Sequence, residues 1–235
     1  MSLKRIDKII SEKSFFSRKE IKKMINKGII HVNGDKISKP EEKYDESDIE
    51  ITINGERVNV KEHIYLILNK PKGYVSSTKM ENKKTVIDLV PEKYKSRNIF
   101  PAGRLDKDTT GFMIITDDGK FAHNILSPRK HVKKIYEVII DIPITDEMIE
   151  GFKRGIELKE GKCKPAIIEV INRNKARITI MEGKYHQIKR MFAKYRANVT
   201  NLNRICIGNL EIPKELKLGD IREATEEELR KIQEI

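Results

Sequence analysis

The chain has 235 residues, which is enough for one large catalytic core or for a small module joined to a medium-sized one. Its 48 Lys and Arg residues outnumber 36 Asp and Glu residues, and the formal net charge of +12 favours a polyanionic partner such as nucleic acid. No apolar run approaches the roughly 20 residues of a spanning helix, so we expect a cytoplasmic protein without a membrane partner.

The cysteines and histidines form no metal or disulfide pattern. Cys163 and Cys206 are the only cysteines, which excludes a disulfide framework and fits a reducing compartment. The five histidines are scattered without an HxxxH or CxxH pair. We therefore expect no bound metal.

The first 60 residues predict two helices followed by a hairpin. The first helix rests on apolar residues at helical spacing, which are Leu3, Ile6, Ile9 and Ile10. Ser17 can cap the second helix while Glu20 completes a capping box, and Gly28 suits the left-handed position that ends it. Asn33-Gly34, between apolar segments, is a strong hairpin signal.

A domain boundary is predicted near residue 60. A second strand at 49–53 leads through Asn54-Gly55 to Val58, and the polar segment 59–63 separates it from a new apolar run. We therefore expect domains over residues 1–60 and 61–235. Residues 1–30 hold nine Lys or Arg and three acidic residues, against four and eight in 31–60, so the helices should form the basic side of the first domain.

Short strands and helices alternate along the rest of the chain, which is typical of an α+β domain. Strands are predicted at 65–68, 112–116, 135–140, 166–171, 176–181 and near Ile205, and helices at 121–126, 145–153, 185–195 and from Thr225, with Glu228, onward. Asp117 and Asp118, between a strand and a helix, fit a turn former and a helix cap better than an acid–base pair.

Two basic stretches are consistent with contacts to RNA phosphates. Residues 119–136 and 183–210 contain several Lys and Arg residues and no acidic residue. A single cluster of this kind is equally typical of a solvated surface. Together with the basic helices of the first domain, the two stretches favour RNA as the partner.

A loop that carries carboxylates precedes the predicted strand at 112–116. Its sequence from residue 103 is Gly-Arg-Leu-Asp-Lys-Asp-Thr-Thr-Gly, and glycines allow backbone geometries that can hold a carboxylate at a sheet edge. The alternative is that Asp106 only hydrogen-bonds the backbone of a nearby threonine in a turn. The spacing alone does not choose between Asp106 and Asp108 as the reactive group.

Two later segments carry further candidates. Tyr136 lies in an alternating strand after four basic residues, where it can pack in the core or stack on a base. In the predicted helix at 185–195, Lys189 could neutralise a buried aspartate. His186, at the start of that helix, is better explained as a structural hydrogen-bonding group than as a general base.

The segments GRLDKDTTGFMIITDDG, KKIYEV and EGKYHQIKRMF together resemble the ribosomal small-subunit (16S) type of pseudouridine synthase. The resemblance covers about residues 63–230, and residues 5–37 resemble the S4-like RNA-binding domain that commonly precedes this catalytic domain. It implies an α+β fold in which a small helix–helix–hairpin domain precedes a catalytic domain with a mixed, largely antiparallel sheet flanked by helices.

The resemblance also implies roles for individual residues. Asp106 matches the family's catalytic nucleophile, Tyr136 its active-site tyrosine and Lys189 the basic partner of the nucleophile. Ile188 matches the apolar residue that supports the uracil, and Arg104 and Arg190 are expected to bind substrate, the latter through a phosphate. The predicted RNA contacts of the first domain, each of which could also be a solvated helix surface, are Arg5, Arg18, Lys19, Lys22, Lys23 and Lys27.

The implied reaction needs no cofactor, because it only moves the attachment of uracil to ribose from N1 to C5. We expect a monomer that acts on ribosomal RNA, either small-subunit RNA or an assembly intermediate. The alternatives are a large-subunit enzyme and a noncatalytic RNA-binding assembly factor. An RNA methyltransferase is disfavoured because residues 65–73 offer only Pro71-Lys72-Gly73 in place of a glycine-rich cofactor loop.

Overall fold

The computed structural model of the chain describes residues 3–14, 16–45, 49–57 and 63–234. The chain forms two compact units, one made of Met1–Ile64 with Val90–Ile99 and the other of Tyr65–Leu89 with Phe100–Ile235. The boundary predicted between residues 60 and 61 lies outside the described residues.

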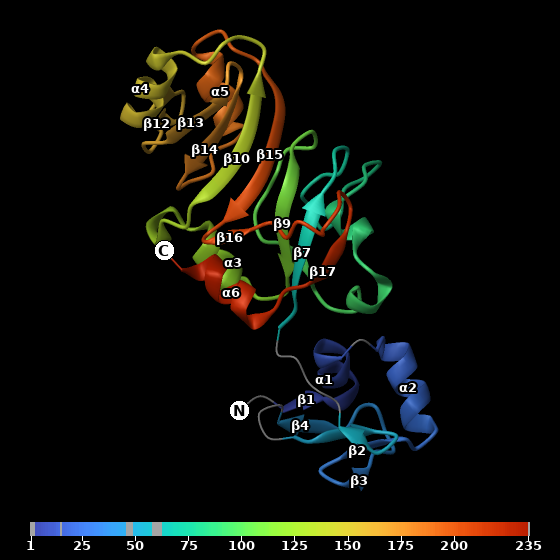
Figure 1. Cartoon of the computed structure of the whole chain (residues 1–235). Coiled ribbons are helices and arrows are strands. Elements are labelled where there is room, and N and C mark those ends of the chain that lie inside the picture. Colours follow the sequence, from blue (N-terminus) through green and yellow to red (C-terminus); the bar gives the residue numbers. More distant parts are fainter. Residues whose placement is uncertain (1–2, 15, 46–48, 58–62, 235) are drawn as a thin grey trace. The chain divides into compact units, whose positions relative to one another are not determined.

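The N-terminal unit contains two helices and short antiparallel strands (Figure 1). In chain order its elements are β1 (Leu3–Arg5), α1 (Ile6–Lys13), α2 (Arg18–Asn26), β2 (Ile30–Val32), β3 (Asp35–Lys36), β4 (Lys43–Asp45), β5 (Ile51–Ile53) and β6 (Glu56–Arg57), and a short 3₁₀ helix at Glu92–Tyr94 is grouped with them. Strands β3, β2, β5 and β6 form one sheet in that order, and β1 pairs with β4. The predicted arrangement of two helices followed by a hairpin is confirmed.

Local signals of the sequence are present in this unit as predicted. The side chain of Ser17 accepts from the backbone of Glu20, whose carboxylate accepts in return from the backbone of Ser17, so the capping box at α2 is complete. Gly28 is left-handed, with φ of 69°, and Asn33 and Gly34 both have positive φ in the β2–β3 turn.

The first helix starts later than its apolar spacing predicts. Leu3 belongs to β1, and its side chain is 61% exposed, because the backbone of this strand pairs with β4. The helix begins at Ile6, which is fully buried with Ile9 and Ile10 in the core of the unit. Backbone pairing has therefore overridden the helical periodicity at the first position.

The second unit is built on a large mixed sheet with helices beside it. Its elements are β7 (Tyr65–Lys70), 3₁₀ helix Val86–Leu89, β8 (Phe100–Pro101), β9 (Thr110–Thr116), α3 (Gly119–Leu126), 3₁₀ helix Pro128–Lys130, β10 (Lys134–Ile140), α4 (Asp146–Arg154), β11 (Glu157–Leu158), β12 (Gly161–Lys162), β13 (Ile167–Asn172), β14 (Lys175–Ile180), α5 (Gln187–Ala193), β15 (Val199–Ile207), β16 (Leu210–Glu211), β17 (Ile221–Glu223) and α6 (Glu226–Gln233). The predicted α+β class and mixed, largely antiparallel sheet are confirmed.

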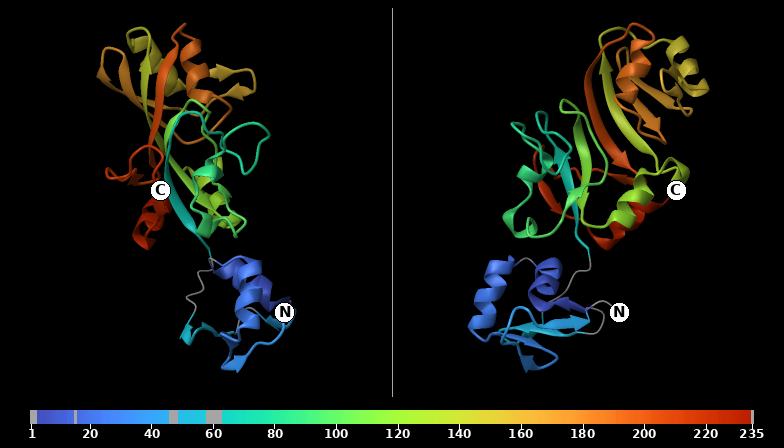
Figure 2. Two further views of the ribbon diagram at one scale, coloured as in Figure 1. Left: turned by 90° about the vertical axis from the view of Figure 1, so that its right-hand side faces the viewer. Right: turned by 180° about the vertical axis from the view of Figure 1, so that it is seen from behind.

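The sheet divides into two halves that meet at a short parallel ladder. Its strand order is β13-β14-β10-β15-β9-β7-β17, with β16 beside β15 and β8 beside β9. Strands β15 and β9 are its parallel pair, joined through Asn203 with Thr110 and Arg204 with Gly111, and beyond this ladder the halves diverge (Figures 1 and 2). A Cβ at residue 111 would collide with the main chain of Arg204, so glycine is required for this close approach.

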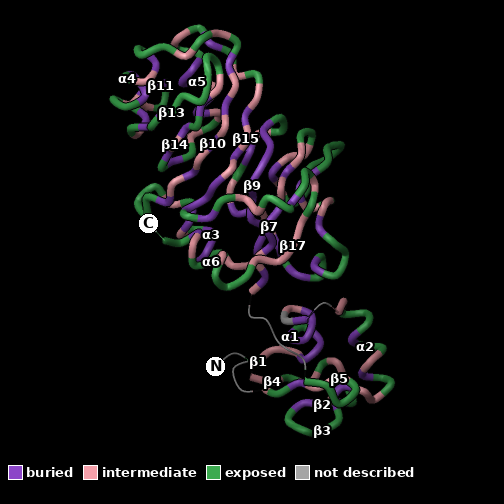
Figure 3. Tube along the Cα trace, viewed as in Figure 1, coloured by how far each residue is buried: buried purple, intermediate pink, exposed green. Residues whose placement is uncertain are grey.

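The interiors of the strands supply most of the core. All seven residues of β9 are buried, and β10 alternates between buried and partly exposed positions, as the tube coloured by burial shows (Figure 3). One helix is shorter than predicted: α5 begins at Gln187 rather than at residue 185, because His186 has a left-handed φ of 47°. Within the described part of the chain, no helix has the length and apolar character needed to cross a bilayer.

Candidate active site

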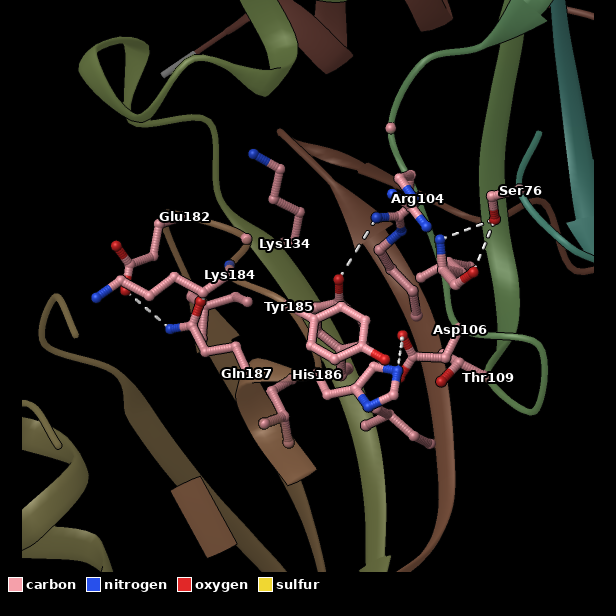
Figure 4. A pocket seen from close by; sticks show the side chains of 18 of the residues that line it. Ser76, Arg104, Asp106, Thr109, Lys134, Glu182, Lys184, Tyr185, His186 and Gln187 are labelled. Carbon is pink, nitrogen blue, oxygen red and sulfur yellow. Dashed lines mark hydrogen bonds and ion pairs between the residues drawn. The ribbon is translucent and has the colours of Figure 1, made fainter. Parts of the chain in front are cut away.

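A cavity of about 650 Å³ opens in the second unit, beside the junction of the two halves of the sheet. Its lining comes from the loop between β8 and β9, from β10 and β15, and from the segment that connects β14 to α5 (Figure 4). Residues that are distant in the sequence therefore face one space of a size suited to a small organic group.

Asp106 presents its carboxylate to this cavity. One oxygen, Oδ1, lies 3.2 Å from Nε2 of His186, and the other, Oδ2, lies 3.1 Å from Nζ of Lys189. The side chain is 23% exposed, so it is accessible from the cavity and yet partly withdrawn from water. Lys189 places a positive charge against this carboxylate.

The loop that carries Asp106 is fixed by side chains of neighbouring segments. Lys70 is fully buried at the end of β7, and its three N–H groups are shared among four main-chain oxygens within hydrogen-bond distance of Nζ, among them those of Asp106 at 3.0 Å and Thr109 at 2.8 Å. The hydroxyl of Ser76 accepts from the backbone N–H of Leu105 and donates to its carbonyl. The position of the carboxylate is therefore set by the fold rather than by a flexible turn.

Asp108 occupies a different environment from Asp106. Its side chain is 70% exposed and is not part of the cavity lining, but its Oδ1 accepts from Nζ of Lys189 at 2.6 Å. This bond lowers the pKa of Asp108. Partial burial alone would lower the pKa of Lys189, but the hydrogen bonds and charges of both aspartates raise it above its usual value.

Strands β10 and β15 form another wall of the cavity. This wall carries Tyr136 and two buried cations, Lys134 and Arg204. Tyr136 pairs with Arg204 across these strands, and Nη1 of Arg204 donates to the tyrosine hydroxyl at 3.4 Å. Nε of Arg204 donates to the carbonyl of Phe112 at 2.7 Å. Lys134, two residues before Tyr136, donates from Nζ to the carbonyl of Ile125 at the end of α3, and its burial lowers its pKa to about 8.

This geometry is accompanied by a match to two known families. The family described as RNA pseudouridylate synthase matches residues 64–194, and the S4 domain family matches residues 4–49. The chain belongs to the RNA pseudouridylate synthase family.

Individual relatives agree with this assignment along nearly the whole chain. The chain is 39% identical over 235 residues to the uncharacterized RNA pseudouridine synthase YtzG of Bacillus subtilis, covering 98% of both chains. It is 43% identical over 170 residues to ribosomal small subunit pseudouridine synthase A of Escherichia coli, covering 72% of this chain and 73% of the relative. A crystal structure of a pseudouridylate synthase aligns with a TM-score of 0.69 at 32% identity, covering 97% of this chain and 99% of the other. The predicted enzyme class is confirmed.

The pseudouridine synthase unit brings most of the predicted site residues together. Arg104, Asp106, Tyr136 and Ile188 line the cavity, and Lys189 reaches Asp106 from α5. Arg190, predicted to bind substrate, is not among the lining residues.

The guanidinium of Arg190 is directed elsewhere. It binds both carboxylate oxygens of Glu160 and donates to the carbonyl of Tyr185 at 3.1 Å. These bonds raise the pKa of Arg190 and lower that of Glu160 to about 2. In this geometry the side chain stabilises the approach of α5 to the β11–β12 connection.

The predicted RNA contacts of the S4 domain fall into two groups. Arg5 donates two hydrogen bonds to the buried carboxylate of Asp7, and Arg18 lies 3.9 Å from the same group. The remaining four are exposed on or just after α2 and form no ion pair with any residue that the structure describes; they are Lys19, Lys22, Lys23 and Lys27.

Two residues of the site were not assigned to it from the sequence. His186 was interpreted as structural, and its contact with Asp106 depends on its left-handed backbone and on the packing of α5. Lys70 is a buried cation whose only local signal is a single charge at the end of the apolar segment Tyr65–Lys70. Lys134 and Arg204 belong to the two basic stretches in which the sequence predicted phosphate contacts, but their burial in the cavity wall was not predicted.

Proposed function

We propose that this enzyme converts a uridine of small-subunit (16S) ribosomal RNA to pseudouridine, with Asp106 as the catalytic nucleophile. The observation that carries the proposal is the carboxylate of Asp106, which faces the cavity between Nε2 of His186 and Nζ of Lys189. The choice of RNA follows the Escherichia coli relative, which is named as a ribosomal small subunit enzyme. A monomer acting in the cytoplasm, on free RNA or on an assembly intermediate, is part of the same proposal.

The chemistry requires a group that can act at the sugar or the base without a cofactor. The bond between N1 and C1′ breaks, the uracil turns, C5 bonds to C1′, the C5 proton leaves and N1 gains a proton. A carboxylate can serve as the nucleophile for such bond changes at a sugar carbon, as it does in retaining glycosidases. Lys189, 3.1 Å from the carboxylate, holds Asp106 in place for this step.

The wall of the cavity supplies the contacts for the base. The ring of Tyr136 stacks on the uracil, and the hydrogen bond from Arg204 holds its hydroxyl in place. Ile188, buried at the start of α5, gives an apolar support for the base, and Arg104, exposed on the loop, contacts the RNA that flanks it.

RNA contacts outside the cavity must offset the opening of the substrate. Removing a uridine from its stack costs on the order of a few kcal/mol. The exposed lysines of α2, which form no ion pair with a described acidic residue, are available to bind phosphates and so to contribute this free energy. The S4 domain thus binds RNA while the second unit carries out the reaction.

Pseudouridine mapping tests this function directly. Unmodified small- and large-subunit RNA would be incubated with wild-type protein, Asp106→Asn or Asp108→Asn, and new sites detected by chemical adduct and reverse-transcription stop. Asp108→Asn is a matched control, because it makes the same change two residues away on an exposed carboxylate. We expect a new small-subunit site with wild type and Asp108→Asn, and none with Asp106→Asn, although its RNA binding is retained.

The other outcomes distinguish the alternatives. A site in large-subunit RNA would correct the substrate and leave the nucleophile in place. Full turnover by Asp106→Asn would remove Asp106 from the mechanism. Tight binding with no site on naked RNA or on assembling subunits would favour a noncatalytic assembly factor.

A further inference from the structure

Two buried cations in the cavity wall have no counter-ion among the residues that the structure describes. Lys134 is 6% exposed and Arg204 is 4% exposed, and both line the cavity. Neither forms an ion pair with an acidic residue in the described part of the chain. A buried charge without an opposite charge nearby destabilises a fold, so its presence calls for a ligand or a structural reason.

The hydrogen bonds of these cations leave donors unused. Nζ of Lys134 has one partner, the carbonyl of Ile125, although an ammonium can donate three bonds. Arg204 uses Nε and Nη1, but its Nη2 is buried and has no partner among the described residues. The other buried polar atom of this kind, the hydroxyl of Thr109, belongs to a second residue that lines the same cavity. Buried donors without partners are rare in folded proteins, so these two atoms call for a partner that the described residues do not supply.

The two acidic residues that line the cavity are already engaged. Glu182 is buried, and its Oε1 accepts from the amide side chain of Gln187 and from the backbone N–H of Lys164, both at 2.9 Å. Asp106 is held by His186 and Lys189. The positive charge of the wall is therefore not paired with an acidic residue of the described ranges.

The two cations also repel each other. Burial is the main cause of the lowered pKa of Lys134, and the charge of Arg204 lowers it further. An anion bound beside both side chains would offset the unfavourable burial of their charges and their mutual repulsion.

We propose that Lys134 and Arg204 bind the backbone phosphate of the uridine that enters the cavity. The inference rests on the proposed function, because every RNA substrate brings such a phosphodiester into the site with its base. The two side chains then fix the depth and orientation of the nucleotide, while Asp106 and Tyr136 act on its sugar and base.

A pair of lysine variants separates this role from a purely structural one. Lys134→Met keeps the length of the side chain and removes its charge. Lys133→Met removes the same charge from the neighbouring residue, which is only partly buried and lies just before β10. We expect single-turnover pseudouridine formation on the 16S transcript to be at least about tenfold slower for Lys134→Met than for Lys133→Met, because a charged hydrogen bond to the substrate is lost. The melting temperature of Lys134→Met should equal or exceed that of wild type, because an uncompensated buried charge is removed.

A change on the RNA identifies the group that is bound. Once the target is mapped, a ligated transcript would carry a neutral methylphosphonate linkage on the 5′ or the 3′ side of that uridine. We expect one of these linkages to slow the wild-type enzyme and to have little further effect on Lys134→Met. Additive losses would show that Lys134 does not contact this phosphate and would overturn the inference.

The remaining outcomes keep the two proposals apart. If wild type forms pseudouridine and the two lysine variants are equally fast, or Lys134→Met is slow only because it melts earlier, the inference fails and the function stands. If wild type forms none, affinity for the transcript at several salt concentrations is the readout. The inference then requires weaker binding and a salt slope lower by about one for Lys134→Met than for Lys133→Met, and equal behaviour overturns it.

Discussion

The two buried lysines of the cavity region, Lys70 and Lys134, have the same chemistry and different surroundings. Burial lowers the pKa of each to about 8. Nζ of Lys70 lies within hydrogen-bond distance of four main-chain oxygens, three of them in the Asp106 loop, whereas Nζ of Lys134 has one partner. The first lysine is committed to holding the protein, and the second retains donors for a ligand. Counting hydrogen-bond partners therefore separates roles that burial and charge alone do not.

The largest effect is expected on the loop side, where Lys189 neutralises Asp106. Lys189→Met should slow pseudouridine formation by roughly 10²–10³-fold, because a charged donor to the reacting carboxylate is lost. Arg190→Met, on the same helix, removes a charge that is bound to Glu160 and should have a much smaller effect. Single-turnover rates measure both. Equal losses for the two variants would mean that the charge of α5, rather than its contact with Asp106, is what matters.

Lys70→Met should damage the fold as well as the activity. Removing the amine takes away the charged donor to the carbonyl of Thr109 and the second donor to that of Asp106, which we expect to lower the free energy of unfolding by about 2–4 kcal/mol. Lys72→Met, two residues later and exposed, is the matched control and should leave stability unchanged within error. Chemical denaturation of the three proteins is the measurement. A Lys70→Met protein as stable as wild type would show that Lys70 is not needed to hold the Asp106 loop and so does not differ from Lys134 in this way.

Lys134→Met should raise the free energy of unfolding, where Lys70→Met lowers it, and the size of this increase should depend on pH. At pH 7 the wild-type amine is charged in the folded and unfolded states, and its burial is unfavourable, so the variant should be more stable by roughly 1–3 kcal/mol. Between the folded pKa of about 8 and the usual pKa near 10.5, the unfolded chain binds the extra proton, so wild-type stability rises with pH and the difference shrinks. Arg204 is the charged group that adds to the burial effect.

Denaturation of wild type and Lys134→Met at pH 7, 8, 9 and 10 would check this. A difference that stays constant with pH would show that Lys134 does not change protonation in this range.

The smallest effect is expected on the exposed cations of α2. Lys22→Gln and Lys23→Gln should each weaken RNA binding a few-fold and reduce its salt slope by about one, because each phosphate contact releases about one counter-ion. The single-turnover rate at saturating protein should not change. Lys153→Gln, an exposed lysine on α4, controls for net charge. If all three variants behave alike, α2 has no special role in binding RNA.

Much of the local structure follows from local chemistry. The capping boxes at Ser17 and Thr225 and the Asn33-Gly34 turn form as expected, because each depends on side chains within three residues of one another. The motifs of the second unit led, through their resemblance to a known family, to Asp106, Tyr136 and Lys189 before any geometry was considered. The geometry then distinguished Asp106 from Asp108 by their exposure and by the cavity that only the first one lines.

The sequence by itself determined the order of the main elements, the basic character of the N-terminal helices and the enzyme family. The tertiary structure decided which charges meet. Arg204 lies against Tyr136, 68 residues away, only because β15 pairs with β10, and Lys189 reaches Asp108 across 81 residues. Leu3, whose spacing predicted a helix, lies instead in β1, because this strand pairs with β4. Periodicity and capping act over a few residues, whereas the partners of a buried charge are set by strand register and packing between distant segments.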